Sequence, residues 1–300
     1  MTKQKKKLKD LTIKDNFMFG AVMVDEENCK RCLELALGIP IEKVTVCREK
    51  SIVYHPEYKG VRLDVIAKDE KRSHYNIEMQ VSAKPALGKR TRYYHSQLDM
   101  EMLEAGRDYR ELADAYVIFI CDYDPFGKRL YRYTWDMICR EVPEVELLDG
   151  SHTIILSTCG ENDSGVSKAL VKFLKFVGAG LDESTEDYAD DYVRRLQASV
   201  AHIKTNREME AKYMLWSELI NEEREEAKEE GRIEGRIEGR IQGQIEMLLE
   251  MLNDLPGIMS ADLEEHIRGT ADLEVLKAYA RMARKAASID EFEGMTKSAE

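Results

Sequence analysis

The chain has few of the features that mark secreted or membrane proteins. Its 300 residues include only six cysteines, and it has no apolar run long enough to cross a bilayer. So few cysteines exclude a disulfide scaffold, and the lysine-rich residues 1–7 lack the apolar stretch of a secretory signal. We therefore predict a cytoplasmic protein with no membrane partner.

An excess of positive charge is also missing. The chain has 57 acidic and 45 basic residues, which gives a formal net charge of −12. Such a surface does not adsorb indiscriminately to nucleic acid, so any contact with DNA must be local. With 43% hydrophobic residues, the chain is long enough for one substantial core and an additional helical region.

Two successive strand-like segments carry the most informative residues. Because side chains alternate across a strand, Asp64 lies opposite the apolar face formed by Val65 and its neighbours at every second position. In the next segment, Glu78 and Gln80 share one face and Met79 takes the other. The charged residues 68–73 between the segments predict a reversal of the chain. A hairpin of this kind brings Asp64 near Glu78.

Two carboxylates and a backbone carbonyl are the hard oxygen ligands that Mg²⁺ prefers, and Mg²⁺ also takes oxygens from a phosphate substrate. A metal ion bound there activates water and stabilises charge on phosphorus. The ordinary alternative is that both acids are solvated residues of amphipathic strands. Spacing alone does not decide between these two interpretations.

Longer motifs connect the segments to a known family. The chain resembles PD-(D/E)XK nucleases, in particular nuclease-family transposases of the recombination-promoting (Rpn) type. The resemblance rests on Leu11-Thr-Ile-Lys-Asp-Asn-Phe-Met-Phe19, Arg62-Leu-Asp-Val65, Tyr75-Asn-Ile-Glu-Met-Gln80, Arg90-Thr-Arg-Tyr-Tyr94 and the C-terminal glycine-repeat helix.

The resemblance implies a restriction-endonuclease-like α/β fold, in which a mixed central sheet is flanked by helices. It also implies that Asp64, Glu78 and the backbone carbonyl of Met79 bind Mg²⁺ or Mn²⁺. Gln80 takes the place of the family's lysine, with a catalytic role of positioning water or phosphate. A neutral amide only donates and accepts hydrogen bonds, so catalysis is slower, more dependent on the metal, or lost in a degenerate nuclease fold.

A basic segment follows the second strand, and no acidic residue occurs between Gln80 and Asp99. A helix is expected from Pro85 to about Glu104, with the proline in its first turn. The candidate nucleic-acid contacts in this segment are Lys84, Lys89, Arg90, Arg92, Tyr93 and Tyr94. The alternative is a helix that packs its tyrosines on the sheet and leaves its basic residues in solvent.

Three other features carry less chemistry. Asp15 is a candidate N-cap for a helix through Phe17. Cys29 and Cys32 form a CxxC without a matching histidine pair, which favours thiols over a zinc site. His95 is expected to be a packed or solvated helix residue rather than part of the phosphate site.

The remaining pattern predicts the order of the elements and three regions. A helix over 26–38 precedes strands at 43–48 and 51–54, and a continuous apolar run at 115–121 predicts a buried strand. Further strands at 130–135 and 152–157 and a helix over 166–177 complete a nuclease-like domain, 1–182. A charged helical region, 183–255, and a terminal helical pair, 261–267 and 271–287 within 256–300, follow.

A four-residue repeat, with glycine at 231, 235, 239 and 243 and isoleucine two residues after each, interrupts the charged region. An α-helix turns every 3.6 residues, so the glycine and isoleucine stripes drift around it, and each glycine costs about 1 kcal/mol relative to alanine. Such a helix needs a partner. The 231–246 repeat therefore predicts a homo-oligomer or a partner helix, with a mobile connector as the alternative.

The sequence as a whole predicts a Mg²⁺-dependent DNA endonuclease, and a link to recombination or mobile elements is carried by the resemblance alone. One alternative is an inactive nuclease fold that serves as an interaction protein. Another is an RNA-directed nuclease, because no residue selects deoxyribose over ribose.

Overall fold

The computed structural model describes residues 6–52 and 61–297, with the side chains of 47–52 and 61–63 left out. Residue contacts divide the chain into two compact units, Met1–Trp216 and Ser217–Glu300. The first unit extends beyond the expected end at Asp182. Its additional helix, α5 (Asp191–Thr205), buries Val193 and Leu196 in the same core as the preceding helices.

A mixed six-stranded sheet, in the order β1-β2-β3-β4-β6-β5, forms the centre of the first unit. β3 and β4 are parallel, as are β4 and β6, whereas the other neighbouring pairs are antiparallel. The strand bounds are β1 Val44–Ile52, β2 Val61–Asp69, β3 His74–Gln80, β4 Ala115–Cys121, β5 Arg132–Trp135 and β6 Ser151–Ser157. The predicted α/β fold with a mixed sheet is confirmed.

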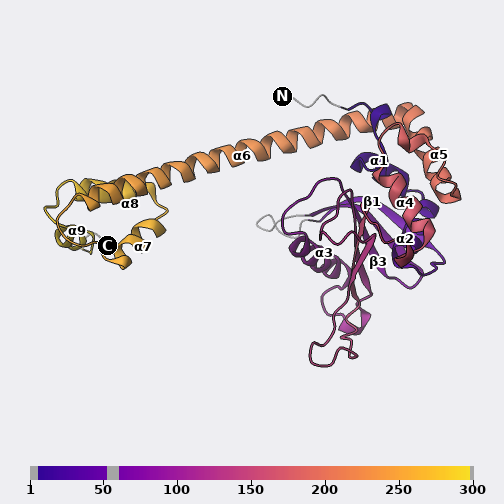
Figure 1. Ribbon diagram of the computed structural model, residues 1–300, viewed down its shortest axis with the longest axis horizontal. Helices are drawn as coiled ribbons and strands as arrows, with labels where there is room; N and C mark the ends of the chain where they lie inside the picture. Colours follow the sequence, from indigo (N-terminus) through magenta and orange to yellow (C-terminus); the bar gives the residue numbers. More distant parts are fainter. Residues whose placement is uncertain (1–5, 53–60, 298–300) are drawn as a thin grey trace. The chain divides into compact units, whose positions relative to one another are not determined.

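Helices cover the two faces of this sheet unequally (Figure 1). One face packs against α1 (Asn16–Met23), α2 (Glu26–Leu37), α4 (Lys168–Gly178) and α5. The other face packs against α3 (Leu87–Met102), which buries Tyr94 and Leu98 on it. Short 3₁₀ helices occur at Leu8–Asp10, Tyr109–Glu111, Asp163–Gly165 and Glu183–Thr185.

The β2–β3 hairpin has the predicted parity. Val65 pairs with Ile77 across the hairpin, and both point into the core under α1 and α2. Ile66, the neighbour of Val65, points to the α3 face instead. Since Asp64 and Glu78 are the next residues beyond the Val65–Ile77 pair, they lie opposite each other on the α3 face.

Several element boundaries differ from the sequence prediction. β1 runs through Ile52 as one strand instead of two, and the predicted residues 53–54 lie outside the described part of the chain. Pro85 precedes α3, because Ala86 at its N-cap takes a left-handed φ of 59°. Asp15 sits at the N-cap of α1 but does not cap it, because its carboxylate accepts a hydrogen bond from the backbone N–H of Thr12 instead.

The second unit contains most of a 47-residue helix, α6 (Arg207–Asn253), and three short helices. α7 (Ala261–Gly269), α8 (Leu273–Ala283) and α9 (Ile289–Lys297) pack on the last turns of α6 around Leu248, Leu252 and Phe292. The prediction of two terminal helices is therefore wrong, because α9 is a third helix in this region. Its start carries a Ser288-x-x-Glu291 capping pattern that the sequence prediction missed.

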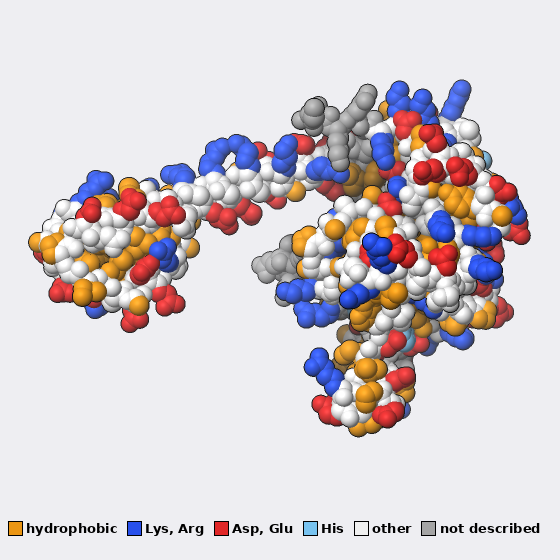
Figure 2. All heavy atoms as spheres, viewed as in Figure 1, with side chains coloured by type: hydrophobic (Ala, Val, Ile, Leu, Met, Phe, Trp, Pro, Cys, Tyr) orange, Lys and Arg blue, Asp and Glu red, His pale blue; other side chains and the backbone are white. Residues whose placement is uncertain are grey.

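The glycine repeat lies within α6 and is helical throughout. Charged side chains dominate the visible side of this helix (Figure 2). The first two isoleucines of the repeat, Ile233 and Ile237, are 48% and 53% exposed, whereas the last, Ile245, is buried in the terminal cluster. A Cβ atom added at Gly231, Gly235, Gly239 or Gly243 meets no atom within 4 Å. The repeat therefore presents an open surface.

Candidate metal centre

The candidate centre lies where β2 and β3 part. Beyond the Val65–Ile77 pair, backbone N–H groups of the two strands donate to carboxylate side chains of the neighbouring strand instead of to its backbone carbonyls. The backbone N–H of Asp64 donates to Glu78 Oε1 at 3.1 Å, and the backbone N–H of Met79 donates to Asp64 Oδ2 at 3.0 Å. Each carboxylate is thus fixed by the strand that carries the other. The hairpin brings Asp64 and Glu78 together as predicted.

Glu78 is a buried carboxyl group, with 5% of its surface exposed. Burial, followed by the nearby Asp64 carboxylate, raises the pKa of Glu78 well above the usual glutamate range, and Arg90 opposes this shift. A cation bound between the two carboxylates would offset both effects, because its positive charge favours the ionised form of each group. The electrostatics of the pair therefore fit a bound metal ion.

Asn76 lies two residues before Glu78 on the same face and is fully buried. Its Nδ2 and Oδ1 atoms have no hydrogen-bond partner in the described part of the chain. Its amide lies close enough to the Glu78 carboxyl group to oppose the rise in the pKa of Glu78. A buried amide without partners is costly, so packing alone does not account for this residue.

The donor set is small but of the right kind for a hard divalent cation. Asp64 and Glu78 supply carboxylate oxygens, and the Met79 carbonyl lies on the same side of β3 as its N–H, which faces Asp64. In the described residues, no three His, Cys, Asp or Glu side chains cluster as a complete metal site. The ion would complete its coordination with water and phosphate oxygens.

Gln80 is the third polar residue of this face, and both ends of its amide are occupied. Its Nε2 donates to the Ser82 carbonyl, and its Oε1 accepts a hydrogen bond from Arg90 Nη1 at 2.8 Å. The same guanidinium donates from Nη2 to the Tyr94 hydroxyl at 3.2 Å. Gln80 therefore holds the guanidinium of Arg90 in place.

Comparison with known proteins adds one finding to this geometry. Residues 18–157 match the family model described as PD-(D/E)XK nuclease family transposase, a segment that contains Asp64, Glu78, Gln80 and the whole of α3. Residues 18–157 belong to the PD-(D/E)XK nuclease family. Neither the search of curated proteins nor that of solved structures found a match. Membership indicates nuclease- or transposase-related chemistry for this nuclease-family domain.

The basic residues beside the centre of the nuclease-family domain differ in exposure. Lys84, Lys89 and Arg92 are exposed, whereas Arg90 and Tyr93 are half-buried. The ring of Tyr94 is buried and stacks on Phe119 of β4, with 5.8 Å between ring centroids. For Tyr94, this placement agrees with the alternative in which α3 packs a tyrosine on the sheet.

His95 and the CxxC cysteines lie in packed surroundings. His95 contacts Thr153 and Ser151 through its two ring nitrogens, at 3.0 and 3.2 Å, and burial lowers its pKa to about 4. Cys29 and Cys32 are buried thiols of α2, and burial raises the pKa of Cys32 to about 12. These residues are parts of the packed interior of the domain.

Sequence reasoning missed one neighbour of the centre. Asn16, the first residue of α1, donates from Nδ2 to the Asp64 carboxylate at 3.3 Å. It lies within the N-terminal motif on which the resemblance rests, but 48 residues separate it from Asp64. Spacing alone could not bring the two together, since only the packing of α1 on β2 does so.

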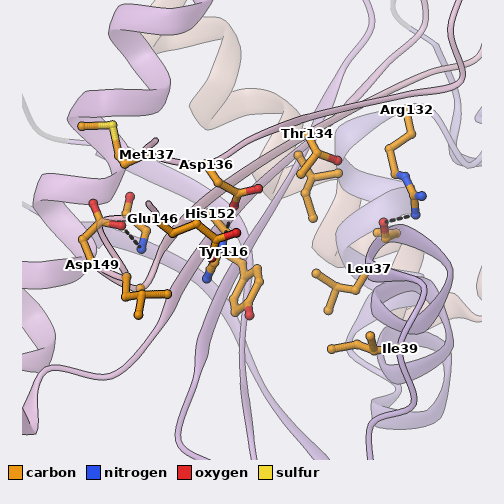
Figure 3. A pocket seen from close by; sticks show the side chains of 15 residues that line it. Leu37, Ile39, Tyr116, Arg132, Thr134, Asp136, Met137, Glu146, Asp149 and His152 are labelled. Atoms are coloured by element: carbon orange, nitrogen blue, oxygen red, sulfur yellow. Dashed lines mark hydrogen bonds and ion pairs between the residues drawn. The ribbon is translucent and has the colours of Figure 1, made fainter. Parts of the chain in front are cut away.

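A separate cavity of about 450 Å³ lies between the end of α2 and strands β4, β5 and β6 (Figure 3). His152 stacks on Tyr116 there, with 4.6 Å between centroids, and its Nδ1 is 2.7 Å from Asp136. None of the residues that line the cavity belongs to the carboxylate centre. The carboxylate centre lies outside this cavity, where β2 and β3 part.

In the described residues, no helix is both long and apolar enough to cross a membrane.

Proposed function

We propose that the protein is a metal-dependent DNA endonuclease whose Asp64, Glu78 and Met79 carbonyl hold Mg²⁺ or Mn²⁺. The observation that carries this proposal is the pair of carboxylates fixed by each other's strand, with Glu78 buried. Buried charges of like sign are costly unless a cation accompanies them. Membership of residues 18–157 in the nuclease family supports the same conclusion.

The bound ion would lower the pKa of a coordinated water and neutralise charge on the phosphate. The protein's own residues fix the geometry. The backbone N–H groups of Asp64 and Met79 orient the two carboxylates, and Asn16 adds a hydrogen bond to Asp64. The buried amide of Asn76 faces the same side as Glu78, where it is available to a ligand or a water of the centre.

DNA is the proposed substrate because a run of exposed cations follows β3 along a chain that is acidic overall. Lys84, Lys89 and Arg92 are suited to contact the phosphate backbone without reading sequence. Hydrolytic cutting is the proposed reaction, and strand transfer is not part of the proposal. The family description includes transposases, which makes a role at mobile elements or in recombination the natural setting for such cutting.

The direct test is nicking and linearisation of supercoiled plasmid by wild type and by the Asp64→Ala/Glu78→Ala double variant, with Mg²⁺, Mn²⁺ or a chelator. We expect metal-dependent cutting that is absent from the double variant. Matched DNA and RNA substrates, assayed side by side, separate the DNA nuclease from an RNA-directed one. A folded wild type that cuts neither would favour the non-catalytic interaction protein.

We also propose that the 231–246 repeat mediates self-association. Residues four apart on a helix form a ridge, so a row of glycines is a groove and the neighbouring row of isoleucines is a ridge. A second copy of the helix inserts its isoleucines into this groove and offers its own groove in return. Two such rows cross at about −50°. The open space at the glycines and the exposure of Ile233 and Ile237 support this proposal.

Solution mass tests the association. Gly235→Leu/Gly239→Leu fills the groove without a clash in the single chain and improves helix propensity. The variant is therefore expected to be at least as helical as wild type but smaller in solution mass. A wild-type mass equal to one chain, or a variant mass equal to that of the wild-type oligomer, contradicts the proposal.

A further inference from the structure

Arg90 differs from the other cations beside the centre because the fold holds its guanidinium in place. It donates to Gln80 Oε1 and to the Tyr94 hydroxyl, and its Cζ lies 5.4 Å from the centroid of the Phe119 ring. In the described part of the chain it forms no ion pair with a carboxylate. A guanidinium has five N–H donors, so donors remain for a further acceptor.

The position of this cation relative to the carboxylates follows from β3. Gln80 and Glu78 are two residues apart on the same face, and Glu78 pairs with Phe119 of β4, over which the guanidinium stacks. The guanidinium therefore lies over the same face of the sheet as the carboxylate pair. Its effect on the pKa of Glu78 has the sign expected of a neighbouring positive charge.

We propose that Arg90 contacts the scissile phosphate beside the Asp64–Glu78 centre, and that Gln80 and Tyr94 are positioning residues that aim its guanidinium. This inference rests on the proposed nuclease function and gives Arg90 a role distinct from that of Lys84, Lys89 and Arg92. Those three side chains are exposed and contact the DNA backbone more broadly. Arg90 stabilises negative charge at the reacting phosphate.

The arrangement suits arginine in particular. A guanidinium stays charged when partly buried, stacks on aromatic rings and presents paired donors that match phosphate oxygens. Arg90 is half-buried and lies over Phe119 and Tyr94, while Gln80 anchors one of its nitrogens, so its remaining donors are available to phosphate oxygens. The amide of Gln80 acts on the substrate only through Arg90.

Charge relocation tests this assignment. Arg90→Met keeps the length of the side chain but removes the charge, and we expect the single-turnover rate of duplex cleavage to fall roughly 100-fold. Since Gln80 Oε1 is 2.8 Å from the guanidinium, a lysine at position 80 places its ammonium in the same region. We therefore expect the Arg90→Met/Gln80→Lys protein to cleave at least roughly tenfold faster than Arg90→Met. A merely structural role of Arg90 predicts that Gln80→Lys changes the rate by the same factor in the wild-type and Arg90→Met backgrounds, whereas charge relocation predicts a larger gain in the Arg90→Met background.

Arg107→Met is the matched control, because Arg107 is an exposed residue paired only with Glu111 among the described residues. It should cleave like wild type. The proposal is overturned if Arg90→Met cleaves at the wild-type rate. It is also overturned if the folded Arg90→Met/Gln80→Lys protein cleaves no faster than Arg90→Met. Far-UV circular dichroism and thermal melting of each variant show whether it is folded.

A second readout separates failure of this inference from failure of the proposed function. Duplex binding in chelator is measured against salt concentration, where loss of one phosphate contact lowers the logarithmic slope by about 1. We expect the slope to decrease by about 1 in Arg90→Met and to return to the wild-type value when Gln80→Lys is added. Arg107→Met should have the wild-type slope. If wild type does not cut DNA but the slopes change as expected, the phosphate contact of Arg90 is supported and the proposed nuclease function is contradicted. Equal slopes for wild type and Arg90→Met would contradict the proposed contact between Arg90 and the phosphate.

Discussion

The two faces of strands β2, β3 and β4 differ in a way that packing does not require. Under α1, α2, α4 and α5, Val65, Ile77 and Met79 belong to one continuous apolar core. Under α3, the same strands bury Asn76, Glu78 and Gln80 among apolar neighbours. The first face has the composition of a stable core, whereas the second accepts the cost of buried polar groups. That difference supports the proposal that the α3 face carries the metal centre.

The largest expected effect is on catalysis. Glu78→Gln keeps the shape of the side chain and an oxygen that can accept the Asp64 N–H, but it removes the charge that a metal ion requires. We expect a loss of cleavage of at least roughly 100-fold without loss of stability, because the neutral amide avoids the cost of ionising a buried carboxyl group. A variant that cuts plasmid at the wild-type rate would erase the functional difference between the two faces.

The opposite outcome is expected one residue earlier. Ile77 is fully buried on the apolar face, and Ile77→Ala removes three carbon atoms from the core. The free energy of unfolding should fall by about 2–5 kcal/mol. Urea titration measures this change, and the variant that remains folded should still bind Mn²⁺. If Ile77→Ala lost Mn²⁺ binding but kept its stability, the proposed division between a stabilising face and a metal-binding face would be contradicted.

Asn76 sharpens the comparison from the polar face. Its amide is buried without a partner, so Asn76→Val removes a desolvated polar group from a strand that favours β-branched residues. We expect unfolding stability to stay the same or to rise by about 1 kcal/mol, while cleavage decreases. A marked loss of stability would mean that the amide is needed for the fold.

The last expected effect concerns the pH dependence of stability and does not involve catalysis. Burial lowers the pKa of His95 to about 4 from 6.5, and Asp149 and His152 act on it with opposite signs. The unfolded chain therefore binds the proton more readily, so stability is complete above about pH 6.5 and falls as the pH drops towards 4. His95→Gln should lose less stability than wild type over this range, by about 2 kcal/mol or less. Parallel thermal melts from pH 7 to 4.5 test it, and identical profiles would contradict it.

Alternation and composition were sufficient to predict the local elements that build the centre. The apolar run 115–121 coincides with β4, and the parity of Asp64 and Glu78 follows from period-two alternation alone. Gly38, with a φ of 78°, ends α2 where a glycine C-cap is expected. These features depend on residues close together in the chain.

Features that depend on docking between elements were beyond the sequence. The contact between Gln80 and Arg90 requires α3 to lie at one particular height over β3, and the contact of Asn16 with Asp64 requires α1 to pack on β2. Likewise, the amphipathic pattern of α5 does not say that Val193 joins the domain core. Periodicity predicts which face of an element is buried, but it does not name the partner.

The most direct test of the account is Mn²⁺ binding to purified wild type and Glu78→Gln, measured by titration calorimetry beside the unfolding free energy of each. Wild type is expected to bind the ion. Glu78→Gln is expected to bind it at least roughly tenfold more weakly, and to unfold at a urea concentration equal to or above that of metal-free wild type, because burial raises the pKa of Glu78. Equal Mn²⁺ affinity in the two proteins would contradict the claim that this carboxylate is buried in order to hold a metal.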